Sequence, residues 1–130
     1  MTKPELPNSA QRLLKVLIVD DSADATEMLA LLLERKSCET VSAHTGADAL
    51  AAFDQHQPDL VLLDLGLPDM DGRAVAAKLR EKPTRAVIVA VSGFAEDSTR
   101  ASSNDFAKHL LKPIEIAALD QVLAMVRAGC

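Results

Sequence analysis

The chain of 130 residues has little of what nucleic-acid binders, disulfide-rich proteins and membrane proteins need. It contains no Trp or Tyr, aromatic residues make up 2% of it, and its net charge is −5. It therefore lacks aromatic platforms for stacking bases and the excess positive charge that attracts phosphate backbones, which argues against direct nucleic-acid binding. Cys38 and Cys130 are too few for a disulfide framework or a zinc site and predict reduced thiols. The absence of a long apolar run and of a signal peptide predicts a cytoplasmic protein with no membrane contact.

The composition of the chain is that of an ordinary globular protein, with 48% apolar and 25% charged residues. Its length fits one domain. Residues 1–13 are mainly polar, contain two prolines and have no hydrophobic periodicity, so we expect a flexible leader or linker there. Residues 14–128 are expected to form the folded domain.

Strand-like and helix-like segments alternate five times along this domain. Unbroken apolar runs predict strands buried on both faces, and shorter β-branched or apolar segments complete the set of strands, over residues 14–19, 39–43, 59–64, 86–91 and 108–111. Helices are expected between and after them, over residues 23–36, 46–57, 72–81, 95–104 and 115–127. The pattern predicts an α/β, doubly wound (βα)5 fold with a five-stranded parallel sheet of order 2-1-3-4-5 and right-handed crossovers.

Two details of the helices bear on function. Ser22 and Asp71 are expected to cap the helices that follow them, and Met28 is expected on the core face of the first helix with Leu33. Residues 95–104 contain few large apolar side chains. They predict a weakly docked helix, which is the natural place for a conformational response.

Polar side chains directly follow four of the apolar runs: Asp20 and Asp21, Asp64, Ser92, and Lys112. Any one of them could be an ordinary turn residue. The carboxyl ends of parallel strands meet at one edge of a sheet, so all of these side chains are expected to converge there. Their convergence favours a functional site over a set of turns.

The expected site has the chemistry of phosphoryl transfer. Three clustered carboxylates repel one another, and Mg²⁺ relieves that repulsion while pairing with phosphate oxygens. We expect Asp21 and Asp64 to bind the ion directly, Asp20 to bind it largely through water, and the Gly66 backbone carbonyl to complete the set; Mn²⁺ or Ca²⁺ can substitute. Asp64 is the expected nucleophile for a phosphoryl group, with Lys112 neutralising its charge and the Ser92 hydroxyl binding one of its oxygens.

These residues together resemble the receiver domain of bacterial response regulators. The likeness spans about residues 14–128 and rests on five motifs: Asp20-Asp21, Asp64 with Pro68, Asp71-Gly72, Ser92-Gly93, and Lys112-Pro113. It implies a flavodoxin-like (CheY-like) fold, a phosphoryl-accepting Asp64, Mg²⁺ at the acidic pair, a switch hydroxyl at Ser92 and a cis Lys112–Pro113 peptide. It also implies a role in a two-component phosphorelay, with a phosphohistidine on a sensor histidine kinase or a histidine phosphotransfer protein as the donor.

Some positions depart from the commonest pattern of that family. His109 stands where the family usually has a Tyr or Phe switch, as in receivers attached to hybrid sensor kinases, and Asp105 and Ile114 replace a common Gly and Phe. The resemblance implies that phosphorylation switches the surface of the fourth helix, fifth strand and fifth helix, through Ser92 and His109. Because no DNA-binding domain follows residue 130, the expected output is a contact with a downstream protein or onward phosphotransfer.

Two alternatives use the same residues. An aspartate-nucleophile phosphatase needs a second acid two residues after its nucleophile, where this chain has Gly66. A degenerate receiver would serve only for docking, but the chain retains every side chain that the chemistry requires. We therefore expect a module that catalyses its own phosphorylation and dephosphorylation and is not a turnover enzyme. The sequence leaves open whether the module stands alone or belongs to a hybrid kinase.

Overall fold

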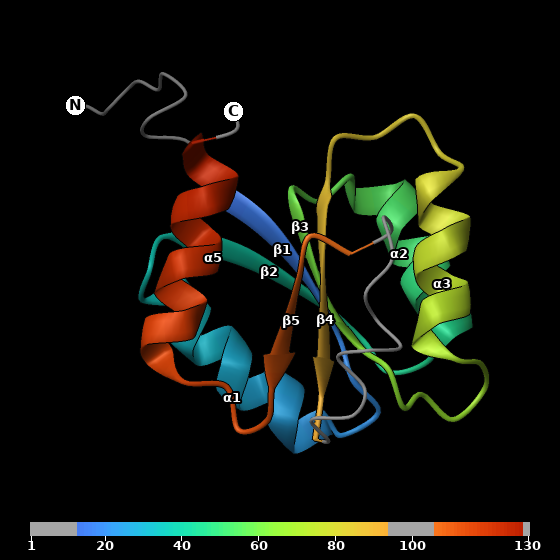
Figure 1. Ribbon diagram of the computed structural model, residues 1–130, viewed down its shortest axis with the longest axis horizontal. Coiled ribbons are helices and arrows are strands. Elements are labelled where there is room, and N and C mark those ends of the chain that lie inside the picture. Colours follow the sequence, from blue (N-terminus) through green and yellow to red (C-terminus); the bar gives the residue numbers. More distant parts are fainter. Residues whose placement is uncertain (1–12, 94–105, 129–130) are drawn as a thin grey trace.

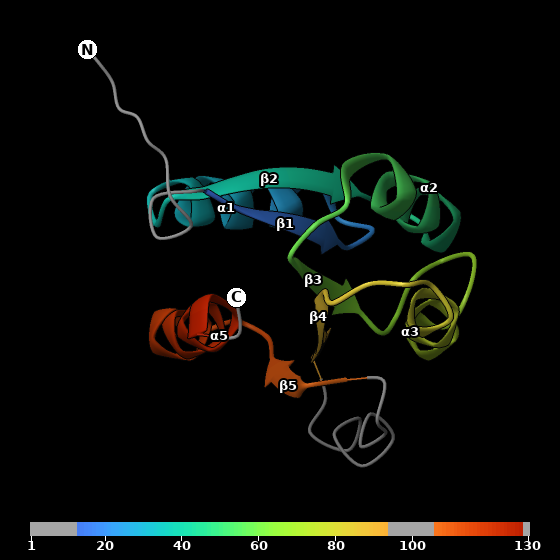
Figure 2. The same cartoon turned by 90° about the horizontal axis from the view of Figure 1, so that it is seen from above.

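The computed structural model describes residues 13–93 and 106–128. Its centre is a five-stranded parallel sheet of order β2-β1-β3-β4-β5, as predicted. The strands are β1 (Leu14–Val19), β2 (Cys38–Ala43), β3 (Leu60–Asp64), β4 (Val87–Ser92) and β5 (Lys108–Leu111). The helices are α1 (Ala23–Glu34), α2 (Gly46–His56), α3 (Gly72–Arg80) and α5 (Ile116–Ala128). Figures 1 and 2 show three layers, with α1 and α5 on one face of the sheet and α2 and α3 on the other.

The central strands have no polar alternation because both of their faces are covered. In β3, Leu60 and Leu62 pack toward α1 and α5, whereas Val61 and Leu63 pack toward α2 and α3. A fully buried side chain of this size stabilises the fold by about 1.5–3 kcal/mol. Two apolar cores on opposite faces therefore fix the register of the sheet, and a slip by one residue would exchange them.

Side-chain caps set the beginnings of three helices. Ser22 Oγ accepts a hydrogen bond from the Ala25 N–H, and Asp71 accepts one from the Arg73 N–H, so both predicted caps are confirmed. Thr45, which the sequence analysis did not single out, caps α2 by accepting from the Asp48 N–H. Each cap satisfies a backbone donor that has no partner inside its helix.

The prediction for the core face of α1 was wrong at Met28, whose side chain is 74% exposed. The buried positions of this helix are Leu33 and Thr26, and Thr26 tolerates burial because its hydroxyl donates to the Ala23 carbonyl. The helix also ends at Glu34, before the predicted Lys36, since Ser37 adopts a left-handed φ of 65°. The predicted helix over residues 95–104 lies outside the described residues.

The topology brings the ends of β1 and β3 together. These two strands pair in register, with Val19 opposite Leu63, so the residues that follow them emerge side by side. The chain reverses its direction of progress across the sheet between β1 and β3, and open α/β sheets bind ligands at such a point. None of the helices in the described part of the chain has the length and apolar character needed to cross a bilayer.

Candidate metal centre at the carboxyl edge of the sheet

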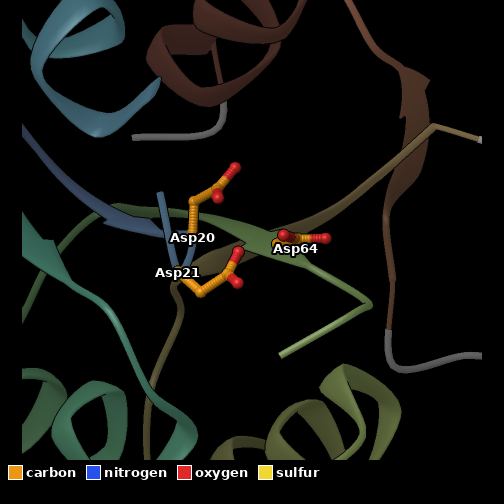
Figure 3. A group of neighbouring side chains, drawn as sticks. All are labelled: Asp20, Asp21 and Asp64. Carbon is orange, nitrogen blue, oxygen red and sulfur yellow. The ribbon is translucent and has the colours of Figure 1, made fainter. Parts of the chain in front are cut away.

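An acidic cluster occupies the edge of the sheet where β1 and β3 end (Figure 3). Asp20, Asp21 and Asp64 each offer a carboxylate oxygen, and these oxygens lie within 4.8 Å of one another. Asp20 and Asp64 are each only 7% exposed, whereas Asp21 is exposed. Burial of unpaired carboxylates is costly, so this arrangement calls for a compensating cation.

Backbone hydrogen bonds orient the two buried carboxylates. Asp20 Oδ1 accepts from the Ser22 N–H at 2.9 Å, while its own backbone N–H donates to the Ala43 carbonyl at 3.1 Å. Asp64 Oδ1 accepts from the Gly66 N–H at 3.0 Å. In both residues the second oxygen, Oδ2, faces the side chain of a lysine from the far end of the chain.

That lysine is Lys112. Its Nζ lies 2.8 Å from Asp20 Oδ2 and 3.3 Å from Asp64 Oδ2. Its backbone N–H donates to the Ser92 carbonyl at 2.7 Å, which ties the residue to the end of β4, and the Lys112–Pro113 peptide is cis, as expected. Partial burial acts to lower the pKa of Lys112, but the hydrogen bond to Asp20 and the charge of Asp64 outweigh it and raise the pKa. Lys112 is therefore an ammonium cation at neutral pH.

Ser92, whose carbonyl accepts from the Lys112 N–H, also contacts His109 through its side chain. The Ser92 hydroxyl is 2.8 Å from His109 Nε2 and is buried. Sequence reasoning named both residues as a switch but did not predict this hydrogen bond. It follows from a rotamer of His109 that no sequence pattern specifies.

The loop between β3 and α3 is held against the start of α2, and sequence reasoning missed the residue responsible. Asp69 accepts hydrogen bonds from the Gly46 N–H at 2.7 Å and from the Ala47 N–H at 3.0 Å. These bonds lower the pKa of Asp69, because they stabilise its charged form at a helix N-terminus. Asp69 thereby anchors the loop that contains Gly66.

Gly72 closes the same loop behind the cluster. Its N–H donates to the Leu65 carbonyl at 3.2 Å, and a Cβ at this position would lie 2.6 Å from the Asp64 carbonyl oxygen. No other residue type has room there. The Asp71-Gly72 motif thus combines a helix cap with the close backbone approach that places Asp64.

An apolar groove of about 620 Å³ leads to the cluster between α1 and the segment after β5. Asp20 and Lys112 are its charged lining residues, and the other lining residues are apolar, among them Met28, Leu29, Leu32 and Ile114. Met28, exposed on α1, is thus part of the lining of this groove. A concave apolar surface with a few charged groups is typical of a binding site.

The donor set fits a hard divalent cation. All three candidate ligands are carboxylates, and the spread of their oxygens, 4.8 Å at most, is close to the separation of about 4.1 Å between opposite oxygens around Mg²⁺. Small side-chain rotations or one bridging water close the difference. Asp20, Asp21 and Asp64 are therefore suited to hold such an ion, with Lys112 as the other cation of the site.

Comparison with known proteins identifies the class of this domain. The sequence model of the family described as response regulator receiver domain matches residues 16–124. The chain therefore belongs to the response regulator receiver family, whose members are phosphoryl-accepting signalling modules. The resemblance seen in the sequence is thereby confirmed.

Individual relatives agree with that assignment. The transcriptional regulatory protein KdpE of Mycobacterium tuberculosis is 37% identical over 116 residues, which cover 88% of this chain and 50% of KdpE. The chain thus spans about half the length of that relative. A receiver domain from Methylobacillus flagellatus is 36% identical with a TM-score of 0.79, over 88% of this chain and 98% of that one. The response regulator TrrA of Thermotoga maritima, solved in complex with Mg²⁺ and BeF, is 26% identical with a TM-score of 0.81, over 88% of this chain and 99% of its own.

Proposed function

We propose that this domain accepts a phosphoryl group on Asp64 from a phosphohistidine, and so works as one step of a two-component phosphorelay. The observation that carries the proposal is the buried Asp64 carboxylate, which lies 3.3 Å from Lys112 Nζ and within 4.8 Å of the Asp20 and Asp21 oxygens. The proposed domain spans residues 14–128. The proposed place of action is the cytoplasm.

In the proposed reaction a carboxylate oxygen of Asp64 attacks the phosphorus atom. A new O–P bond forms, the N–P bond of the donor breaks, and the donor imidazole nitrogen keeps the electron pair and takes up a proton. Lys112 Nζ is placed to neutralise a phosphoryl oxygen, and Ser92 to donate its hydroxyl proton to another. Mg²⁺, for which Mn²⁺ or Ca²⁺ can substitute, would neutralise the remaining charge when held by Asp21, Asp64, the Gly66 carbonyl and, through water, Asp20.

The phosphoryl group adds about −1.5 to −2 charge beside Lys112 and Ser92. We propose that this charge biases a two-state surface that includes β5, α5 and the helix predicted at residues 95–104. The domain thereby signals to a downstream protein and turns over no external substrate. It contacts neither nucleic acid nor membrane directly.

The donor is proposed to be a sensor histidine kinase or a histidine phosphotransfer protein. The apolar groove beside α1 supports docking there, since its lining includes Asp20, Lys112 and the exposed Met28. A donor seated on this groove would present its phosphohistidine to Asp64.

The decisive experiment is incubation with phosphoramidate and Mg²⁺ followed by intact-mass measurement. We expect a single phosphoryl adduct on the wild-type domain, none on Asp64→Asn, and an unchanged yield for Asp48→Asn, a control at an exposed carboxylate of α2. Omission of divalent cations should abolish the adduct. Fast release of phosphate without any adduct would identify a phosphatase instead, and no reaction would identify a domain that only docks.

A further inference from the structure

Two backbone donors at the start of α2 find their partner on a different element of the fold. The Gly46 N–H donates to Asp69 Oδ1 at 2.7 Å, and the Ala47 N–H donates to Asp69 Oδ2 at 3.0 Å. The next donor, the Asp48 N–H, is satisfied by the cap residue Thr45. One carboxylate on the loop between β3 and α3 therefore completes the hydrogen bonding of the first turn of α2, with one oxygen for each N–H group.

A second contact joins the same two segments. Gly46 has no side chain, and a Cβ at this position would overlap Met70 Cγ and lie 2.7 Å from Met70 Sδ. Met70 therefore lies directly against the start of α2. Leu67 and Met70 also pack, half-buried, against the apolar core beneath α2 and α3. The tip of the loop is thus fixed to α2 by a polar contact and an apolar contact.

The opposite end of the loop is bound to the acidic cluster. The Gly66 N–H donates to Asp64 Oδ1 at 3.0 Å. Only Leu67 and Pro68 separate Gly66 from Asp69, and the ring of Pro68 fixes its own φ. Because the connection is so short and partly rigid, a displacement of Asp69 is transmitted to Gly66.

We propose that Asp69 is a positioning residue that couples the metal centre to α2: it holds the loop so that the Gly66 carbonyl is in place for Mg²⁺, and bound Mg²⁺ in turn tightens the contact of Asp69 with α2. The inference deepens the proposed function and rests on it, because Gly66 is one of the proposed ligands. The coupling runs to the side of the sheet that α2 and α3 cover (Figure 2), whereas the proposed signalling surface includes β5 and α5.

The physical basis is that a ligand group held in place before binding costs less to order. When Asp69 contacts α2, the loop loses little freedom as a cation binds, and without that contact the cation must order the loop itself. Residues that orient metal ligands typically change metal affinity by about 10- to 100-fold. Asp69 is exposed and acts through the backbone, so we expect a smaller factor of about three to ten. Linkage requires that the cation stabilise the contact by the same factor.

The first test measures the affinity of the domain for Mg²⁺ by NMR titration, since the chain has no Trp or Tyr for intrinsic fluorescence. Asp69→Ala should bind Mg²⁺ about three- to tenfold more weakly than the wild type, and Asp69→Asn, which keeps one acceptor oxygen, should lie between the two. Asp48→Asn is the matched control, because it removes an exposed carboxylate from the same turn of α2 and leaves Asp69 in place. This control should bind Mg²⁺ like the wild type.

A second variant releases the same loop without any change of charge. Gly46→Ala places a methyl group where Met70 lies, so it should displace the loop from α2 and weaken Mg²⁺ binding as well. In the Gly46→Ala background, Asp69→Ala should change the affinity less than it does in the wild type, because both substitutions break the same attachment. Gly93→Ala is the control, since its new methyl group meets no atom within 4 Å.

The reciprocal effect is measured in α2 itself. Saturating Mg²⁺ should slow hydrogen exchange of the Gly46 and Ala47 amides in the wild type by the same factor of about three to ten. In Asp69→Ala these two amides should not respond to Mg²⁺. A role of Asp69 confined to the stability of α2 predicts no response to the cation in either protein.

Three results would overturn the inference. Equal Mg²⁺ affinity of Asp69→Ala and the wild type would show that the contact with α2 does not place a ligand. A loss in Asp48→Asn as large as that in Asp69→Asn would show an effect of charge alone. Exchange of the Gly46 and Ala47 amides that ignores Mg²⁺ in the wild type would show that α2 is not coupled to the site. If the wild type itself does not bind Mg²⁺, the proposed metal site fails as well, whereas the other three results leave the proposed function standing.

Discussion

Replacement of Gly72 by alanine tests the way in which Asp64 is positioned. A Cβ at this site would lie 2.6 Å from the Asp64 carbonyl oxygen and 2.7 Å from Leu65 Cα. Both obstacles are backbone atoms, so no side-chain rotation can relieve the overlap. The strand end that carries Asp64 and the first turn of α3 must therefore move apart.

The size of the effect follows from two opposing terms. No glycine in the described residues has a positive φ, so alanine suits the backbone of Gly72 and by itself would stabilise the protein by about 0.4–1 kcal/mol. An overlap of this kind costs about 1–3 kcal/mol, and we take the upper half of that range because the obstacle consists of backbone atoms. We expect a net loss of about 1–2.5 kcal/mol in the free energy of unfolding, or about 3–6 °C in Tm for each kcal/mol.

Urea denaturation followed by circular dichroism measures this loss, and Gly93→Ala is the matched control. Gly93 follows β4 at the same edge of the sheet, and a Cβ there meets no atom within 4 Å. That variant should stay within about 0.5 kcal/mol of the wild type. Gly72→Ala should also weaken Mg²⁺ binding, because Asp64 is displaced. If both variants are equally stable and bind Mg²⁺ equally well, the close approach of Gly72 does not position Asp64.

Three further predictions concern the surroundings of Asp64. Lys112→Met removes a cation that competes with Mg²⁺ for Asp20 and Asp64. Calorimetry should therefore find Mg²⁺ bound about three- to tenfold more tightly, while phosphorylation becomes slower. The control Lys82→Met, in which the lost ion pair is with Asp54, should change neither quantity. Asp69→Asn should lower the urea midpoint at neutral pH, and its difference from the wild type should disappear as the pH falls below 3.8. The reason is that a carboxyl group with a lowered pKa stabilises the fold only while it is charged. A difference that stays constant with pH would contradict this prediction. Met28→Glu should slow phosphoryl transfer from a phosphorylated donor protein without changing the rate of phosphorylation by phosphoramidate. Met125→Glu, which lies outside the lining of the groove, should change neither rate. Equal effects of the two variants would count against docking at the groove.

The sequence predicted the sheet and the convergence of charged side chains because both depend on simple patterns. Unbroken apolar runs such as 60–63 require cover on both faces, and parallel strands bring their carboxyl ends to one edge. Asp20, Asp21, Asp64 and Lys112 were placed together on that reasoning alone, and the structure brings them together.

Other features could not be predicted because they depend on choices that no pattern encodes. Hydrophobic periodicity gives the width of the buried face of a helix but not its centre, so it places Met28 in the core. In the structure Thr26 takes a buried position of α1 instead, because its hydroxyl donates to a carbonyl of the same helix. The hydrogen bonds that Asp69 accepts from the Gly46 and Ala47 N–H groups join residues that are 23 and 22 positions apart in the sequence. They depend on a loop whose side-chain directions follow no period. The hydrogen bond between Ser92 and His109 depends on a single rotamer.

The distances around Lys112 also bear on the proposed reaction. The ammonium group is closer to Asp20 Oδ2, at 2.8 Å, than to Asp64 Oδ2, at 3.3 Å. Its shorter contact is thus with Asp20 and not with Asp64, the proposed acceptor. A phosphoryl group on Asp64 would offer Lys112 oxygens of higher charge, so the lysine would exchange Asp20 for the new anion. Because that exchange leaves Asp20 without its cation, a divalent ion at the acidic cluster becomes more necessary after phosphorylation than before it.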